Sequence, residues 1–416
     1  MNQSNLGLTR LSRVQGDTEH LIEGVVSLQR DQSGGGNTEI GQERAGERAL
    51  PRLKSAAHKP AKTILFAGGG TGGPVTPLLA IAEVIKAERP ELNLIFVGGN
   101  SGPERKLAEG AGLKFYSIPT VKWRRYFSWT NIYDLFVLPI AVAKSMLLLI
   151  RHGVGVVVNA GSYVGVPVIW AAWLLRRKIL IHHQDIELSL STKLTMPLAS
   201  SMSVVFPEQK KYSPYALVAG NPVRNFLSKG NRHQGLDMFK LDSNRPVVFV
   251  FGGGGGSLRI NELIEASVNG LLDRGVQVIH QTGRHVSSSY DFLAHISPGY
   301  YRIQFLTTET PDAYAAADIV VSRAGLANIS ELSYLGKTAI IIPIPDSHQE
   351  ANARLLAEKN AAVVLNEKEL SGEKLSEEII KLIQDKEKQK VISQNIFNLM
   401  PHGAANTIAQ LVYKLL

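Results

Sequence analysis

The sequence predicts an α/β protein made of two Rossmann-like, doubly wound domains that face each other across a cleft. Three stretches carry this prediction. Residues 63–87, 247–271 and 319–335 each combine a short apolar strand, a glycine-bearing loop and a helix. Glycines at such junctions let the backbone turn sharply and bring its amides close to a phosphate. Because the unit recurs in both halves, we expect two nucleotide-type sheets.

Composition excludes several classes of protein. The 416 residues are 44% apolar and 19% charged, which is typical of a globular chain with about two domains. The absence of cysteine excludes disulfides and thiolate chemistry, and no histidine or carboxylate pair has metal-ligand spacing, so we expect no cofactor or metal. The net charge of +9 favours an anionic partner, and the lack of nucleic-acid motifs favours an anionic membrane surface over nucleic acid.

The domain boundaries follow from shifts in composition. Residues 1–60 are polar and poor in aromatics, so we expect a disordered extension with at most a transient helix at 21–28, and no signal peptide. The remaining predicted segments are an N-terminal acceptor and membrane domain (61–225), a linker (226–245), a C-terminal nucleotide domain (246–400) and a last helix (401–416) that packs back on the first domain.

The first domain opens with strands at 63–67 and 92–97 around a glycine loop at 68–73. No acidic residue directly follows the second strand, which disfavours a nicotinamide cofactor. Farther on, the basic aromatic run 122–129 leads into the apolar stretch 132–150, which Asp134, Pro139 and Lys144 interrupt. This pattern fits a helix at a membrane surface, or equally an ordinary amphipathic helix, better than a spanning one.

Two further strands of this domain end in polar residues. The strand 154–158 leads into a second glycine turn at 159–167, and the strand 179–182 leads into His183, Gln184 and Asp185. Parallel strands present their carboxyl ends at one edge, where open α/β sheets bind ligands. Residues 218–224 then finish the half with a Gly-Asn-Pro turn and Arg224.

Residues 318–352 form the most informative stretch. After the strand 319–321 and the turn 322–325, apolar residues recur at every third position from Leu326 until Gly336 ends the helix. A helix opening there favours a diphosphate. Glu331 could accept hydrogen bonds from a ribose diol, or with equal weight simply complement the helix dipole. The polar run 343–352 suits a polyhydroxylated ligand, or else caps a helix through Asp346 or Ser347.

A set of motifs runs in order along the chain from Thr63 onward: Gly69-Gly70-Thr71-Gly72-Gly73, Gly161-Ser162-Tyr163, His182-His183-Gln184-Asp185, Gly220-Asn221-Pro222-Val223-Arg224, Ser322-Arg323-Ala324-Gly325 with Ser330-Glu331, and His348-Gln349 with Asn352-Ala353. In these motifs the chain resembles the MurG-type undecaprenyl-pyrophosphoryl-muramoylpentapeptide N-acetylglucosaminyltransferases, inverting GT-B enzymes of glycosyltransferase family 28.

The resemblance implies transfer of N-acetylglucosamine from UDP-N-acetylglucosamine to undecaprenyl-linked lipid I, giving lipid II for peptidoglycan. It also implies a peripheral position on the cytoplasmic side of the inner membrane, with other cell-wall synthesis proteins as partners. The residues it places at UDP-sugar are Arg224, Gly254, Leu306, Leu326, Ala327, Asn328, Ile329, Ser330, Glu331 and Gln349. Those it places toward the acceptor and the transferred sugar are Thr71, Gly72, Gly73, Tyr163 and Asp185.

Three departures from the family pattern fall near the reaction. Pro74 replaces a histidine considered for the role of base, Gly254 replaces a serine, and His-Glu-Gln-Asn reads His182-His183-Gln184-Asp185. We therefore expect deprotonation by Asp185 or His183. The alternatives are a related transferase acting on another lipid, a UDP-sugar epimerase of similar fold, which the membrane-directed segment disfavours, and a UDP-sugar-binding protein without catalysis.

Overall fold

The computed structural model describes residues 63–70, 72–100, 102–120, 129–283 and 298–416, with the side chains of 129–135 excepted. The expected N-terminal extension, Thr71 and most of the basic aromatic run at 122–129 lie outside these ranges.

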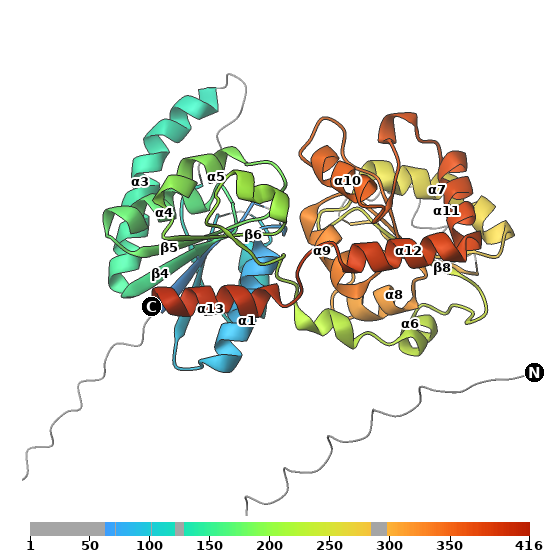
Figure 1. Cartoon of the computed structure of the whole chain (residues 1–416), viewed down its shortest axis with the longest axis horizontal. Helices are drawn as coiled ribbons and strands as arrows, with labels where there is room; N and C mark the ends of the chain where they lie inside the picture. The colour runs from blue at the N-terminus through green and yellow to red at the C-terminus, as the bar shows by residue number, and fades with distance from the viewer. Residues whose placement is uncertain (1–62, 71, 101, 121–128, 284–297) are drawn as a thin grey trace, which may run out of the picture. The chain divides into compact units, whose positions relative to one another are not determined.

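The first domain is built on a parallel sheet with the strand order β3-β2-β1-β4-β5-β6-β7 (Figure 1). Its strands are β1 (Thr63–Ala67), β2 (Asn93–Gly98), β3 (Lys114–Ser117), β4 (Val154–Asn159), β5 (Lys178–His183), β6 (Ser201–Val204) and β7 (Leu217–Val218). Its helices are α1 (Val75–Glu88), α2 (Glu104–Gly110), α3 (Trp129–Arg151), α4 (Gly165–Leu174) and α5 (Leu190–Thr195), with 3-10 turns η1 (Met196–Leu198) and η2 (Pro207–Lys211).

Helices cover both faces of this sheet. One core layer joins the sheet to α1 and to α13 (Ala404–Leu415), and the other joins it to α3 and α4. The central strands β1 and β4 are therefore apolar on both faces, as their continuous apolar runs predict. Figure 1 shows α13, the last helix of the chain, lying beside α1, against which it packs.

The second domain is built on a parallel sheet with the strand order β10-β9-β8-β11-β12-β13. Its strands are β8 (Val247–Phe251), β9 (Gln277–Gln281), β10 (Tyr300–Ile303), β11 (Ile319–Ser322), β12 (Ala339–Ile341) and β13 (Val363–Val364). Its helices are α7 (Leu258–Asp273), α8 (Thr310–Ala316), α9 (Leu326–Leu335), α10 (Gln349–Glu358), α11 (Gly372–Gln384) and α12 (Lys386–Phe397), with the 3-10 turn η4 (Glu367–Glu369).

The segment expected to be a linker is packed against the second domain. It carries η3 (Asn225–Lys229) and α6 (Arg232–Met238), and both contact α8. Where the chain leaves the first domain, Gly220 has φ +77° and lies directly against the Pro401 carbonyl, so a side chain at position 220 would collide with it. The outgoing and returning chain segments are thus in contact.

Candidate active site

Two glycine loops of the first sheet meet at the ends of β1 and β4. The Ser162 hydroxyl donates to the Gly69 carbonyl at 2.9 Å. Gly70 has φ +88°, and a Cβ added there would lie 2.6 Å from the Tyr163 ring. Gly72 and Gly73 follow, half-buried, and lead into α1. The structure therefore brings Tyr163 against the first glycine loop.

A buried carboxylate that the sequence did not point to holds this loop in place. Glu104, 1% exposed, accepts from the Gly99 amide at 3.0 Å and the Gly70 amide at 3.4 Å. Its second oxygen, Oε2, has no hydrogen-bond partner in the described part of the chain. Burial, and secondarily the Glu104 charge, raises the pKa of Tyr163, so this phenol stays protonated near neutral pH.

The two histidines at the end of β5 point to opposite faces of the sheet, because side chains alternate along a strand. His182 is buried between Ser203 and Asn221, 3.0 and 2.9 Å from its ring nitrogens. The His183 ring packs edge-on against Tyr212 and is 2% exposed, and its Nε2 lacks a partner among the described groups. Burial lowers the pKa of both to about 4, so both are neutral at pH 7.

The turn that carries Asp185 is held by the buried side chain of Gln209. The Gln209 amide nitrogen donates to the carbonyls of Asp185 and Gln184 at 2.7 and 3.0 Å. The Asp185 carboxylate is half-buried, and Asn352 of α10 donates to its Oδ1 at 3.3 Å. Asp185 is thus fixed by partners from both domains, and its Oδ2 makes no hydrogen bond within the described part of the chain.

In the domain expected to bind the nucleotide, α9 begins without a side-chain cap. Gly325 is its N-cap and provides no side-chain hydrogen bond, so the amides of the first turn are available. Gly336 ends the helix with φ +61°, as predicted. Within the expected UDP run, the side chains of Leu326, Asn328, Ile329 and Ser330 are buried, while Ala327 and Glu331 are partly buried.

Glu331 is the sixth residue of α9, so it lies beyond the first turn, within which a dipole effect is strong. The Tyr314 hydroxyl donates to its Oε2 at 2.7 Å. Burial raises the pKa of the Glu331 carboxyl, and Tyr314 and Arg224 partly oppose the shift. Glu331 is therefore a positioned carboxylate with one oxygen tied and the other available.

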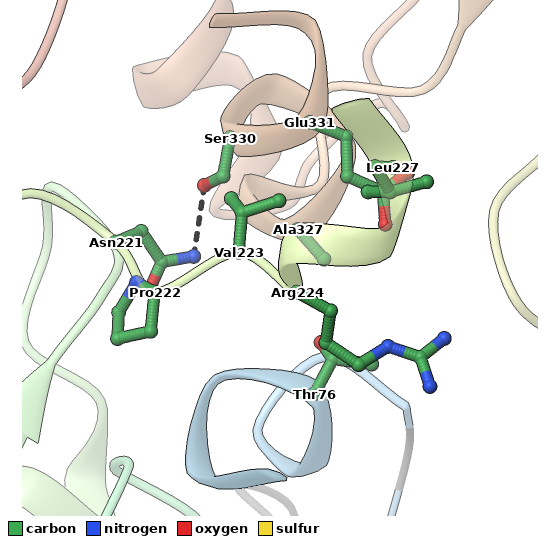
Figure 2. A pocket seen from close by; sticks show the side chains of 9 residues that line it. All are labelled: Thr76, Asn221, Pro222, Val223, Arg224, Leu227, Ala327, Ser330 and Glu331. Carbon is green, nitrogen blue, oxygen red and sulfur yellow. Dashed lines mark hydrogen bonds between the residues drawn. The ribbon is translucent and has the colours of Figure 1, made fainter. Parts of the chain in front are cut away.

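A small recess brings this carboxylate together with Arg224 and with Thr76 of α1 (Figure 2). The Arg224 guanidinium lies 4.4 Å from the Phe226 ring centroid, which helps to fix its direction. The remaining lining residues are Asn221, Pro222, Val223, Leu227, Ala327 and Ser330. Sequence analysis missed Thr76, which stands three residues beyond the expected acceptor loop.

The other residues expected near UDP-sugar surround α9. Gly254 is exposed, and a Cβ added there would meet nothing within 4 Å. Leu306 is a core side chain and its amide donates to Gln281 Oε1 at 3.2 Å, so only its carbonyl is available to a ligand. Gln349 begins α10, and its Nε2 lies 3.9 Å from the Cβ position of Gly325, so its amide is beside the start of α9.

Buried Arg323 ties the loops of the second sheet together. It donates to Ser257 Oγ at 2.7 and 3.1 Å, to the carbonyls of Ile342 and Pro343, and to Glu367. Ser257 caps α7, which follows the 252–256 glycine run. This arginine thus fixes the glycine loop relative to the end of β12.

Exposed apolar side chains gather on α3 and on α4, which packs against it. Phe136 and Leu147 of α3 are 70% and 66% exposed, and Trp173 of α4 is 54% exposed. Lys144 and Arg151 are exposed on the same helix as the first two. Within the described part of the chain, no helix combines the length and apolar character that crossing a bilayer would require.

Two parallel sheets with glycine loops at their carboxyl ends, joined at a recess that holds an arginine and a carboxylate, define the GT-B class of sugar-nucleotide proteins. The crystal structure of Acinetobacter baumannii MurG superposes with a TM-score of 0.66 at 22% identity, covering 85% of this chain and 100% of that one. A putative UDP-N-acetylglucosamine 2-epimerase from Listeria monocytogenes shares the fold, with a TM-score of 0.65 at 11% identity, covering 85% and 96%.

Sequence comparisons identify the family. The models for the glycosyltransferase family 28 N-terminal and C-terminal domains match residues 64–204 and 247–410. A UDP-N-acetylglucosamine–N-acetylmuramyl-(pentapeptide) pyrophosphoryl-undecaprenol N-acetylglucosamine transferase from Geobacillus kaustophilus is 34% identical, over 79% of this chain and 92% of the relative. One from Clostridium botulinum is 31% identical over 85% and 99%. The chain belongs to glycosyltransferase family 28, and it is a glycosyltransferase, as its motifs predicted.

Proposed function

We propose that the chain transfers N-acetylglucosamine from UDP-N-acetylglucosamine to lipid I, with inversion at the sugar, and so forms lipid II for peptidoglycan. The observation that carries this proposal is the recess where Glu331 and Arg224 come together beside the first two turns of α9, a helix without a side-chain N-cap. The named activity of relatives that match nearly their full length supports the same reaction.

In this proposal UDP-N-acetylglucosamine is bound by backbone amides of α9 and by two charged side chains. The free amides at the start of α9 and the Arg224 guanidinium neutralise the diphosphate, and the untied oxygen of Glu331 accepts from the ribose diol. Gln349, beside the start of α9, contacts hydroxyls of the sugar. Gly254 leaves room at the diphosphate and contributes only its amide.

The reaction needs a nucleophile, a leaving group and a proton acceptor. The muramoyl O4 attacks C1 of N-acetylglucosamine from the face opposite UDP, the bond between C1 and the diphosphate oxygen breaks, and that oxygen leaves with the electron pair. Arg224 and the amides of α9 stabilise the charge that grows on the diphosphate. The O4 proton passes to a base on the acceptor side, where Tyr163 and the loop at 71–73 hold lipid I.

Asp185 is the base in this proposal. Pro74 has no side-chain proton acceptor, and the His183 ring is buried on the sheet face that packs against Tyr212. Asp185 is half-exposed, and its carboxylate is oriented by Asn352 from the second domain. Asp185→Asn should lower kcat by about 100-fold or more with little change in UDP affinity, whereas His183→Gln should not.

The enzyme works at a membrane surface from the cytoplasmic side. Phe136, Leu147 and Trp173 enter the interface, and Lys144 and Arg151 meet anionic headgroups. In this proposal the acceptor loops would work on an undecaprenyl chain that stays in the bilayer. Other proteins of cell-wall synthesis would meet it there.

Purified enzyme, labelled UDP-N-acetylglucosamine and lipid I in detergent test the function directly. Label recovered in lipid II, with β-configuration at the new bond, supports the proposal. Label in another polyprenyl acceptor alone, epimerised sugar nucleotide, or UDP-sugar binding without transfer would each overturn it.

A further inference from the structure

A chain of buried hydrogen bonds runs from the first sheet into helix α9. Ser203 lies 3.0 Å from His182 Nδ1, His182 Nε2 lies 2.9 Å from Asn221 Oδ1, and Asn221 Nδ2 lies 2.8 Å from Ser330 Oγ. Ser330 Oγ in turn donates to the Leu326 carbonyl at 2.6 Å. The four linked side chains are each at most 5% exposed, so water does not compete for these bonds.

The direction of every bond in this chain is determined. The Leu326 carbonyl can only accept, so the Ser330 proton goes to it and the Ser330 oxygen must accept from the Asn221 amide. The Asn221 oxygen then accepts from His182 Nε2–H, and His182 Nδ1 accepts from the Ser203 hydroxyl. A single orientation satisfies all members, so replacing any one of them leaves a buried neighbour unpaired.

Each inner member of the chain adjoins a residue of the proposed active site. Ser330 precedes Glu331 on α9, Asn221 is three residues before Arg224, and His182 is three residues before Asp185. Figure 2 shows the Asn221 amide directed at the Ser330 hydroxyl at the edge of the Glu331 recess. A second recess, lined in part by residues 400–406, also includes Asn221 and Ser330 in its wall.

We propose that Asn221 is a positioning residue that couples donor binding on α9 to the acceptor-side turn at 182–185. This inference rests on the proposed function and adds a mechanism by which the two substrates cooperate. A donor that engages Glu331 and Arg224 fixes α9, the Asn221 bridge transmits that position to His182, and Asp185 is brought into register for the acceptor. A second polar contact at this turn is longer: Asn352 donates to Asp185 Oδ1 at 3.3 Å, and the Ile186 amide donates to Asn352 Oδ1 at 3.4 Å.

The test measures cooperativity between substrates. Binding of a soluble, short-chain lipid I analogue is measured by calorimetry with and without saturating UDP, in the full-length enzyme. UDP should tighten analogue binding by about 5-fold or more in the unmodified enzyme, a typical size for coupling between sites. Asn221→Ala and Ser330→Ala should reduce that factor to nearly 1, and Ser330→Thr, which retains the hydroxyl, should restore it.

If Asn221 had only a structural role, its loss would weaken the binding of both ligands but would not change the ratio of analogue affinities with and without UDP. This ratio therefore separates a positioning role from a structural one. Thermal unfolding of each variant shows which ones are folded. If Asn221→Ala does not fold, the comparison of Ser330→Ala with Ser330→Thr still tests the coupling. An unmodified enzyme that binds UDP and the analogue independently, or folded alanine variants that keep the full factor, would overturn the coupling. An enzyme that binds no UDP at all would instead refute the proposed function.

Discussion

Removing the Glu331 carboxylate is expected to weaken UDP binding by about 30- to 1000-fold. The untied oxygen would accept hydrogen bonds from both hydroxyls of the ribose diol, and bonds to a charged group contribute ~1.5–3 kcal/mol each. Part of this contribution is offset by the cost of burying the charged carboxylate, which also raises its pKa. We therefore expect Glu331→Ala to weaken UDP binding by roughly 2–4 kcal/mol. Isothermal calorimetry with UDP gives the change directly.

The same substitution has a predictable side effect. The Tyr314 hydroxyl, 1% exposed, donates to Glu331 and would be left unpaired, which costs ~1–3 kcal/mol of stability. Glu331→Gln keeps an acceptor for Tyr314 and should remain nearly as stable. Tyr314→Phe is the matched control, because it retains the carboxylate and should change UDP affinity by less than about 3-fold.

A second ligand isolates the ribose contact. 2′,3′-Dideoxy-UDP lacks both hydroxyls, so the unmodified enzyme should bind it about as weakly as Glu331→Ala binds UDP. The alanine variant should not distinguish the two nucleotides by more than about 3-fold. If it discriminated as strongly as the unmodified enzyme, Glu331 would not be the ribose ligand and the assigned donor orientation would be wrong.

Three further outcomes are expected. Gly254→Ser should lower the KM for UDP-N-acetylglucosamine by up to about tenfold, because the new side chain has room and can donate to the diphosphate; an unchanged or higher KM would contradict this. The pKa of His183 is about 4 when folded and near 6.5 when unfolded, so titration of this ring should by itself lower stability by up to ~3 kcal/mol between pH 7 and pH 4, in addition to the loss from His182, whose pKa is also about 4. Urea unfolding of His183→Phe, which cannot titrate, should show a shallower loss. Because burial raises the pKa of Glu331, UDP affinity should begin to fall at a higher pH than an ordinary carboxyl would produce, and calorimetry across pH should find no such fall in Glu331→Gln.

The elements that sequence patterns predicted well are those with local causes. The strand, glycine turn and helix at 319–336 follow from apolar spacing and from a glycine that accepts φ +61°, and both can be read from neighbouring residues. The sequence prediction listed all six residues 326–331 as UDP ligands, whereas the helix leaves only some of their side chains accessible. With 3.6 residues per turn, only Ala327 and Glu331 turn their side chains outward.

The polar contacts that fix the site were not predictable in this way. Glu104 reaches an amide 34 positions away, and Asn221 reaches a serine 109 positions away. Nothing in the local sequence of either residue indicates a partner, because these bonds depend on how strands and loops pack. His182 and His183 were treated as a pair by motif, yet strand alternation gives them different faces and different partners.

Pro74 stands where the family resemblance would place a histidine, and its side chain offers no proton acceptor. Pro74 is the N-cap of α1 with φ −71°, a value that its ring prefers, and proline is well tolerated at a helix start. A carboxylate elsewhere on the acceptor side, such as Asp185, then suffices if the reaction is dissociative. When C1 carries most of its positive charge before O4 bonds to it, the O4 proton becomes acidic late, and a carboxylate can take it. Asp185 would also stabilise that positive charge, which neutral His183 could not do.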